Sequence, residues 1–441
     1  MKEANHNTHF NQFARYAGLS VLGTLGVSCY ILADTFFVAN GLGTKGLAAL
    51  NIAIPVYNFI WGIAIMLGIG GATRYTIARS RGENELGDRI FSTTLAVSMA
   101  VSAVFALLGI FGAEMVARLL GADEEILEMT TDYLKVVLTF APAFSLNQIM
   151  TCFVRNDGAP NLAMQGTLIG SLANIILDYV FIFPMKMGIL GAALATVCSP
   201  IISLGIMWRH KARGKNNFHL RKDMSDFVNL GKTAALGFPS LVTEMSSGVV
   251  IIAFNYIILG LAGNVGVAAY GVIANISLVV IAIYNGIDQG VQPLMSDSYG
   301  RGLMTDARKY LQYALVTAAA VSVLIYAVIY LGAEPIVAAF NSEKDSALQV
   351  IAVSGLKIYF AGILLAGCNI VLQIFFTSVE RPLPAQVISL LRGLLLIIPA
   401  AFLLAEAFGI TGVWLAFPVT ETVVAIIGCL IYTMDKRRSV K

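Results

Sequence analysis

Twelve apolar segments of membrane-spanning length constrain this chain more than any other feature. A helix of about 20 apolar residues crosses the hydrocarbon core of a bilayer. Hydrophobic residues make up 57% of the 441 residues and charged residues only 12%, and a soluble protein carries roughly twice that charged fraction. We therefore expect an all-α membrane protein with spans at residues 13–39, 51–74, 90–112, 133–154, 163–184, 188–208, 232–260, 268–292, 309–331, 349–377, 385–406 and 411–433.

Lysine and arginine fall mainly on one side of the membrane in this arrangement. Of the 29 such residues, 22 lie in the tails, loops and span ends on the side of the termini, six lie toward the opposite side, and Arg392 lies well within a span. Cytoplasmic loops carry the excess of positive charge in membrane proteins. We therefore expect both termini in the cytoplasm, and the protein in the cytoplasmic (inner) membrane of a prokaryote.

The two halves of the sequence repeat one another. The segment GTKGLAAL at Gly43 matches GNVGVAAY at Gly263, and GILGAALA matches GITGVWLA. The first cytoplasmic loops match as well, with Gly82 aligned by eye to Gly300. Offsets between matched residues stay between 218 and 222 along the chain, which indicates one duplicated unit of six spans.

Six spans per copy is an even number, so both copies enter the membrane in the same sense. Such copies are related by an axis along the membrane normal, with a cavity between the two lobes. Two like halves around a central cavity favour alternating access. We expect a cytoplasmic tail at 1–12, an N-lobe at 13–208, a cytoplasmic linker at 209–231, a C-lobe at 232–433 and a basic tail at 434–441.

The copies differ at an acidic residue of their first span, where Asp34 aligns with Phe254. A carboxylate inside a span costs several kcal/mol unless it is paired, neutral or hydrated. Asp34 lies five residues from the outer end of the first expected span, about 8 Å at 1.5 Å per residue. An interfacial residue near the helix end is the alternative interpretation.

Oxygen-bearing side chains of two further N-lobe spans lie at a matching depth. Asp178 is six residues from the outer end of the fifth span, and Asn174 is one turn below it on the same face. Thr196 lies eight residues from the outer end of the sixth span, with Ala192 one turn above. Carboxylate, amide and hydroxyl groups suit a hard cation such as Na⁺, or a proton shared by the carboxylates. The aligned C-lobe residues are Leu396, Ala400 and Phe417.

Other polar residues within the spans have more than one interpretation. Glu244, near mid-depth in the seventh span, is a candidate for a second titrating group or a substrate site, with a structural hydrogen-bonding role as the alternative. Arg392 and Glu421 suggest a buried structural ion pair. Candidates for the lining of a substrate cavity, for each of which ordinary packing is the alternative, are Met66, Met150, Phe153, Tyr256, Asn275, Tyr284, Asn369 and Gln373.

Several motifs in consistent order resemble the multidrug and toxic compound extrusion (MATE) family. They are ADTFFVANGLGTKGLAALNIAIP, RNDGAPNLAM, NIILDYVFIF, GILGAALAT and the loop SYGRG. The resemblance covers essentially the whole chain, including its duplication, and within the family it looks similar to the MepA-like branch. It implies a V-shaped pair of six-helix lobes that exports amphiphilic, often cationic drugs in exchange for inward H⁺ or Na⁺.

The resemblance also implies a cation site in the N-lobe. In many members this site consists of an aspartate in the first span, an Asn and an Asp one turn apart in the fifth, and a threonine and a backbone carbonyl in the sixth. The corresponding residues here are Asp34, Asn174, Asp178, Thr196 and Ala192. A Na⁺ ion would bind at the first four. Another branch of the family uses acidic groups on the seventh and tenth spans. This chain keeps Glu244 but has no Asp or Glu between residues 346 and 379.

Other functional classes lack support in the sequence. There is no P-loop, no histidine within a span, no metal-ligand spacing of cysteines and no nucleophile motif, so we expect no enzyme activity and no cofactor beyond H⁺ or Na⁺ as coupling ion. The net charge of +3 gives no reason to expect nucleic acid as a partner. We expect a functional monomer in the lipid bilayer that binds small amphiphilic cations. An exporter or flippase of a single lipid-linked or metabolite substrate is the alternative.

Overall fold

The computed structural model describes residues 2–222, 225–341 and 344–438. The first residue of the N-terminal tail, two residues of the predicted linker and the last three of the basic tail lie outside this part of the chain. Within it the backbone is almost entirely helical and contains no strand. The prediction of an all-α membrane protein is confirmed.

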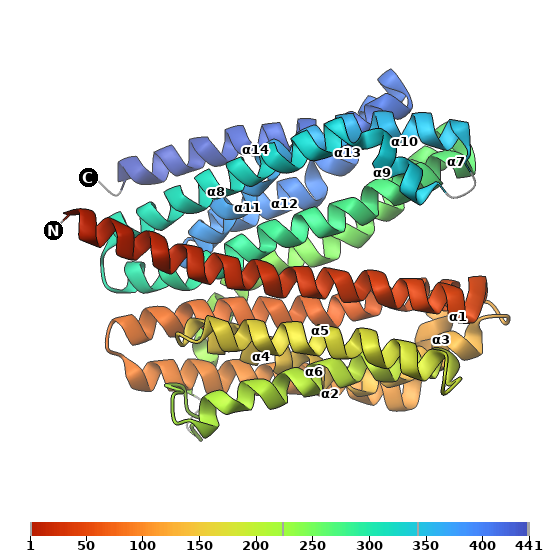
Figure 1. The fold of residues 1–441 in the computed structure, drawn as a ribbon. Helices are drawn as coiled ribbons and strands as arrows, with labels where there is room; N and C mark the ends of the chain where they lie inside the picture. Colours follow the sequence, from red (N-terminus) through yellow and green to blue (C-terminus); the bar gives the residue numbers. More distant parts are fainter. Residues whose placement is uncertain (1, 223–224, 342–343, 439–441) are drawn as a thin grey trace. The chain divides into compact units, whose positions relative to one another are not determined.

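Fourteen α-helices and three shorter helical turns make up the described residues (Figure 1). The first half contains α1 (Lys2–Ser80), α2 (Asn84–Leu119), α3 (Leu127–Thr139), α4 (Ala141–Asn156), α5 (Pro160–Ile182), α6 (Gly188–Ala212) and η1 (Ser225–Asn229). The second half contains α7 (Leu230–Gly300), α8 (Met304–Leu331), α9 (Ala333–Phe340), α10 (Ser346–Tyr359), η2 (Phe360–Gly362), α11 (Ile363–Ser378), α12 (Pro382–Leu390), the π-helical turn η3 (Leu391–Leu395), α13 (Ile397–Phe408) and α14 (Ile410–Arg438).

Nine helical stretches of the described residues are long and apolar enough to cross a membrane, or ten with the bent pair α3–α4. Two of them, residues 8–80 and 226–300, contain 73 and 75 residues, and each rises more than 100 Å at 1.5 Å per residue. That length is sufficient for two spans. In Figure 1 the first part of α1, in red, runs in one direction, and its second part, in orange, runs back beside it. Counted in this way, the stretches correspond to the twelve predicted spans.

A glycine divides each of these two long helices into its two spans. Gly43 in α1 has φ 67° and ψ −159°, and Gly263 in α7 has φ 61° and ψ −157°. Only glycine adopts this backbone conformation readily. The two residues are aligned by the sequence repeat, so both copies turn at the same place. The sequence analysis aligned Gly82 with Gly300, and this pairing is wrong. The glycines with a left-handed backbone in the turns before α2 and α8 are Gly82 and Gly302, at an offset of 220.

The chain forms two compact units. The N-terminal unit comprises Arg15–Met245 and Ser296–Leu303, and the C-terminal unit comprises Met1–Ala14, Ser246–Met295 and Met304–Lys441. Within the N-terminal unit α5 packs along α6 and α2 packs on α3 and α4. Within the C-terminal unit α13 packs along α14 and α8 packs on α11. Equivalent helices therefore pair in each unit, as expected from a duplicated sequence.

A hydrogen-bond network around Asp157 fixes the end of α4 in the N-terminal unit. Its carboxylate accepts hydrogen bonds from the Tyr75 hydroxyl at 2.6 Å and from the Asn217 backbone N–H at 2.8 Å, and lies 2.8 Å from Nε2 of His210. Burial raises the pKa of Asp157, but these bonds favour its charged form and the net effect lowers the pKa below its usual value. The network ties the predicted linker to α4 and α6.

Candidate functional site

Two buried carboxylates of the N-terminal unit form the centre of the candidate site. Asp34 on α1 is 8% exposed and Asp178 on α5 is fully buried. The two are close enough for their charges to interact. Neither forms an ion pair with a Lys, Arg or His within the described ranges. We call Asp34 and Asp178 the carboxylate pair.

The depth of the carboxylate pair differs from the sequence estimate. The first span continues to the break at Gly43, so Asp34 lies nine residues, about 13 Å, from its end. Helix α5 ends at Ile182, which places Asp178 four residues from the end rather than six. Counted from the helix ends, the two carboxylates therefore do not lie at the matching depth that the sequence analysis expected, because Asp34 is deeper within its helix and Asp178 is closer to the end of its helix.

The other predicted ligands lie on α5 and α6. Asn174, one turn before Asp178 on α5, is fully buried. Thr196 on α6 is nearly buried, and its hydroxyl donates a hydrogen bond to the Ala192 carbonyl at 3.0 Å. This bond places the Ala192 carbonyl oxygen beside the Thr196 oxygen. The sequence prediction therefore selected groups that the fold places on neighbouring helices.

Two tyrosines that the sequence analysis missed adjoin the carboxylate pair. Tyr133 on α3 interacts electrostatically with both carboxylates and lies within hydrogen-bond reach of Thr196. Tyr30, one turn before Asp34 on α1, interacts electrostatically with both as well. The one-turn spacing from Asp34 was a usable signal for Tyr30. Nothing in the sequence indicated Tyr133, because α3 reaches the site only through tertiary packing.

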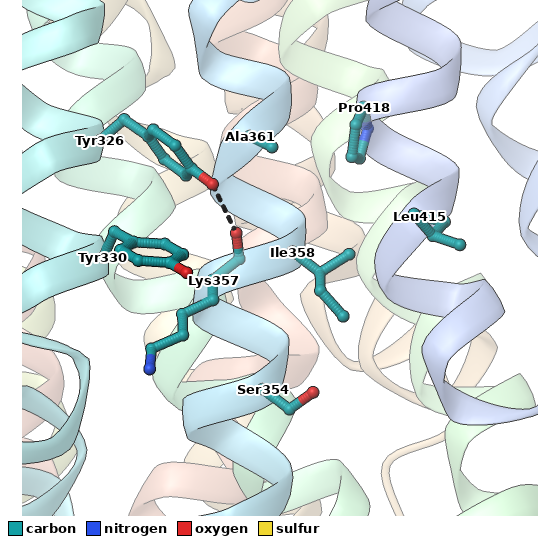
Figure 2. A pocket seen from close by; sticks show the side chains of 8 residues that line it. All are labelled: Tyr326, Tyr330, Ser354, Lys357, Ile358, Ala361, Leu415 and Pro418. Carbon is teal, nitrogen blue, oxygen red and sulfur yellow. Dashed lines mark hydrogen bonds between the residues drawn. The ribbon is translucent and has the colours of Figure 1, made fainter.

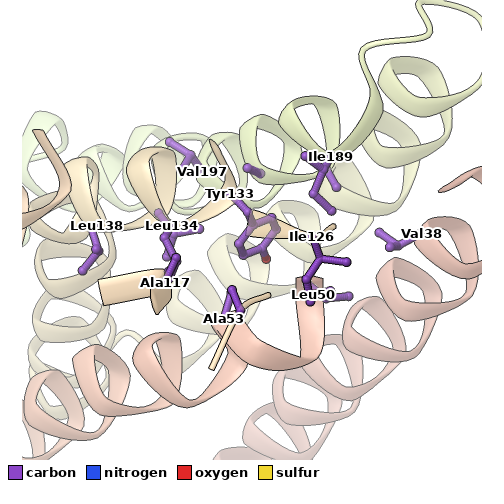
Figure 3. Close-up of a cluster of buried hydrophobic side chains, with 14 of the residues drawn as sticks. Val38, Leu50, Ala53, Ala117, Ile126, Tyr133, Leu134, Leu138, Ile189 and Val197 are labelled. Atoms are coloured by element: carbon purple, nitrogen blue, oxygen red, sulfur yellow. The ribbon is translucent and has the colours of Figure 1, made fainter. Parts of the chain in front are cut away.

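An apolar core surrounds Tyr133, which is 4% exposed. Side chains from α1, α2, α3 and α6 meet around the ring, as Figure 3 shows for Leu50, Leu134 and Ile189 among others. Such packing lowers the local dielectric, which makes an uncompensated charge more costly. The carboxylate pair therefore needs a compensating cation or proton.

Several buried polar atoms of the site lack hydrogen-bond partners, and their chemistry indicates which ligand the site could bind. One oxygen of Asp34, both of Asp178, and the amide oxygen and nitrogen of Asn174 are buried without a hydrogen-bond partner in the described chain. Buried polar atoms of native proteins rarely lack partners. Oxygen donors of this type fit Na⁺, and protonation of one carboxylate would supply a donor to the other. No cluster of three or more His, Cys, Asp or Glu among the described residues could hold a metal ion.

Glu244, on the first half of α7, lies in the same unit. Its Cβ is 3.6 Å from the position that a Cβ on Gly62 of α1 would occupy. Its charge interacts with Tyr57 and Tyr30, whose hydroxyls are 3.1 Å apart. Tyr30 is therefore within electrostatic range of all three carboxylates. Tyr57 also stacks on Trp61, with ring centroids 6.2 Å apart.

The C-terminal unit places a carboxylate in a different environment. Glu421 on α14 accepts a hydrogen bond from Arg392 at 2.6 Å and one from the Asn369 amide at 2.7 Å. The carboxylate is buried and Arg392 is 11% exposed. The predicted ion pair is thus present, and Arg392 lies in the π-helical turn η3. This unit neutralises its buried carboxylate with its own arginine.

The predicted cavity residues occupy varied environments. Phe153 and Tyr284 are fully buried, Met66 and Met150 are partly buried, and Tyr256 and Asn275 are exposed. Phe153 packs on other aromatic rings, and the Tyr284 hydroxyl bonds to Ser322 at 2.7 Å. Asn369 bonds to Glu421, and Gln373 is buried with its amide oxygen unpartnered. Their role in a cavity stays a prediction.

A tight contact joins α1 and α7 within the N-terminal unit. Gly70 and Gly237 bring the two backbones so close that a Cβ on Gly237 would lie 2.5 Å from the Met66 carbonyl carbon. Beside them Arg74 donates to Asp226 at 2.6 Å and 3.2 Å and to the Thr233 hydroxyl at 2.9 Å. We call this region, residues 66–74 with residues 226–237, the α1–α7 clamp. The sequence analysis counted Arg74 only as a loop charge.

A duplicated bundle of spanning helices, with a carboxylate pair buried in one copy, is typical of a membrane transporter. A MatE family model matches residues 20–180 and 239–403, which is most of both halves. The chain belongs to the MatE (MATE) family of multidrug efflux transporters, as the motifs predicted. It is a multi-pass membrane protein of a transporter family and not of an enzyme family.

Individual relatives agree with this assignment. The multidrug export protein MepA of Staphylococcus saprophyticus is 26% identical over 428 residues, which cover 95% of this chain and 92% of the relative. A solved multidrug resistance MATE family transporter in an outward-facing conformation has a TM-score of 0.90 at 23% identity, over 96% of this chain and 95% of that one. A transporter of the MOP superfamily from Pyrococcus furiosus, described as having a binding pocket of reverse polarity that suggests a different function, has a TM-score of 0.90 at 23% identity, over 98% and 96% of the two chains. At these identities the solved structures show the shared fold.

Proposed function

We propose that the chain exports amphiphilic, often cationic small molecules by alternating access, in exchange for H⁺ or Na⁺ that enters at the carboxylate pair. The observation that supports this most is a pair of interacting, buried carboxylates with unpartnered oxygens and no basic partner among the described residues. Two adjacent negative charges in a low-dielectric site repel one another. A bound cation or proton removes that cost and leaves again when the site opens to the other side.

Each residue of the site has a distinct role in this proposal. Asp34 and Asp178 bind the coupling ion, Asn174 and Thr196 add neutral oxygens, and the Ala192 carbonyl completes the set. Ion binding shifts a conformational equilibrium only if it favours one conformation. Because Asp34 is on α1 and Asp178 on α5, an ion bound by both draws the two helices together, and its release frees α1 to move.

Glu244 is the proposed contact for the positive charge of the drug. A carboxylate attracts organic cations through its charge, and the negative faces of tyrosine rings within electrostatic range add to that attraction. Tyr30 and Tyr57 connect its electrostatic environment to that of the carboxylate pair. The coupling ion and the drug would therefore influence each other's binding without sharing a site. Both termini lie in the cytoplasm in this proposal, and a single chain is sufficient.

The test is export of a fluorescent cationic dye from proteoliposomes under an imposed ΔpH or ΔpNa, applied separately. We expect the wild type to respond to one gradient, and Asp34→Asn to lose the gradient-driven component, since an amide neither repels its neighbour nor exchanges a proton. The control is Asp132→Asn, which changes an exposed carboxylate on α3. Wild-type export by Asp34→Asn would remove the carboxylate pair from the coupling mechanism.

The same vesicles test the substrate class. Glu244→Gln is expected to weaken export of cationic dyes more than that of neutral amphiphiles. Cells that express the wild type should tolerate several unrelated cationic compounds. Protection against none of them, with a single metabolite or lipid-linked precursor transported, would favour the exporter or flippase of one substrate.

A further inference from the structure

A groove on the C-terminal unit is lined by a lysine, two tyrosines and apolar side chains. It is formed by α8, α10 and α14 and encloses about 470 Å³ (Figure 2). The Tyr326 hydroxyl donates to the Lys357 carbonyl at 3.2 Å, which fixes α8 against α10. The remaining lining residues are Tyr330, Ser354, Ile358, Ala361, Leu415 and Pro418.

Lys357 has no ion-pair partner among the described residues. Its ammonium lies 5.3 Å from the centroid of the Tyr330 ring, and it forms no hydrogen bond with a side chain of those residues. A groove in the N-terminal unit differs in this respect. There Arg118 is bound by Glu114 at 3.0 Å and by Glu124 at 2.6 Å. A groove that contains a basic group without a carboxylate is complementary to an anion.

The position of Lys357 along its helix identifies the source of that anion. The stretch Ser346–Ser378 has 33 residues, about 50 Å at 1.5 Å per residue, of which about 30 Å lies in hydrocarbon. Lys357 is eleven residues from its start, so its Cα is roughly 6 Å inside the hydrocarbon boundary. A lysine side chain reaches that far, which brings its ammonium to the level of the lipid headgroups.

The tyrosines and the apolar floor agree with this position. Tyr330 is one residue from the end of α8 and is half exposed, as expected of an aromatic residue at a membrane interface. In Figure 2 the Lys357 ammonium points toward the Tyr330 and Ser354 end of the groove, which is the end nearer the start of α10. Ile358, Leu415 and Pro418 offer an apolar floor for an acyl chain.

We propose that this groove binds a phospholipid of the outer leaflet, with the lipid phosphate on Lys357 and Tyr330 and an acyl chain along Ile358 and Leu415. An ammonium and a phenol hydroxyl donate to phosphate oxygens. The site is independent of the carboxylate pair and of the exported substrate. It depends on the proposed orientation, in which the start of α10 is on the outer side.

Native mass spectrometry of the full chain in a neutral detergent tests the proposal. The probes are phosphatidylglycerol, the diacylglycerol with the same chains, and inorganic phosphate. We expect one phosphatidylglycerol per chain to be retained more strongly than the diacylglycerol, and not to be displaced by inorganic phosphate. Lys357→Gln should weaken this retention about fivefold, since one basic residue near a lipid headgroup contributes about 1 kcal/mol.

Two further variants make the result specific. Lys344→Gln removes the same charge from an exposed loop position of the same unit and should leave retention unchanged. Ile358→Trp fills the groove with Lys357 still present and should lower retention. Equal retention by Lys357→Gln and the wild type, equal loss in Lys344→Gln, or displacement by inorganic phosphate alone would each overturn the proposal.

Discussion

Substitution of Gly237 by alanine should force open the α1–α7 clamp. The added methyl carbon would lie 2.5 Å from the Met66 carbonyl carbon and 2.9 Å from its Cα, whereas carbon atoms pack at about 3.5 Å or more. The obstacle is backbone rather than a flexible side chain, so the helices must separate by about 1 Å. Overpacking of this kind costs about 1–3 kcal/mol.

Two effects of the substitution oppose each other, and their magnitudes decide the sign. Replacing glycine by alanine within a helix stabilises the helix by about 1 kcal/mol. The overpacking cost of about 1–3 kcal/mol equals or exceeds this gain. Gly231 on the same helix has nothing within 4 Å of its Cβ position. Gly231→Ala therefore keeps the helix gain without the clash. The two variants should change stability in opposite directions.

Hydrogen–deuterium exchange of peptides covering residues 66–80 and 230–245 measures the opening of the clamp. After the helix gain is subtracted, the net cost is at most about 2 kcal/mol, which corresponds to roughly 30-fold in the population of the opened form, so Gly237→Ala should exchange faster by up to that factor in both peptides. Gly231→Ala should exchange at the wild-type rate or more slowly. Equal exchange in the two variants would refute the steric reasoning. Gly70→Ala, which meets the Thr233 backbone, should reproduce the effect of Gly237→Ala.

Two other predictions concern charges outside the proposed cation site. Asp157→Asn should lower the free energy of unfolding by about 2 kcal/mol at neutral pH. Because the pKa of Asp157 is lowered in the fold, the stabilisation by its carboxylate is present above about pH 4 and is lost as the pH falls through the folded-state pKa. Melting curves of the variant and the wild type should therefore converge in acid. Arg392→Gln should cost about 3–5 kcal/mol because it leaves Glu421 buried and unpaired, whereas the double variant Arg392→Leu, Glu421→Leu should recover most of the loss; a double variant as unstable as the single one would contradict this.

The spans and the repeat were predictable from sequence because lipid imposes strong and local constraints. Apolar length located the helices, and equivalent glycines at Gly43 and Gly263 marked equivalent turns. The exact pairing of the turns before α2 and α8 was wrong by two residues, since short polar loops carry little pattern. The continuation of the first span to Gly43 was missed for a related reason. In the sequence, polar residues near the end of a span have the same pattern whether the helix ends at them or continues through them.

The candidate site was predictable only in part. Asp34 and Asp178 were found because charge within a span is costly and therefore conspicuous. Tyr133 was missed because its approach depends on how α3 packs, which no periodicity encodes. The pairing of Arg74 with Asp226 spans 152 positions, and from sequence Arg74 looked like one more cytoplasmic charge. Contacts between residues far apart in the sequence could not be predicted from sequence patterns.

The two units differ in how they compensate a buried carboxylate, and that difference bears on where coupling energy enters. In the C-terminal unit the countercharge of Glu421 is the guanidinium of Arg392, which is covalently attached and cannot leave. In the N-terminal unit Asp34 and Asp178 have no such group among the described residues, so their countercharge must come from solution. An ion gradient does work only through a site whose occupancy can change. In the proposed function the gradient therefore acts on the carboxylate pair of the N-terminal unit and not on the Glu421–Arg392 pair of the C-terminal unit.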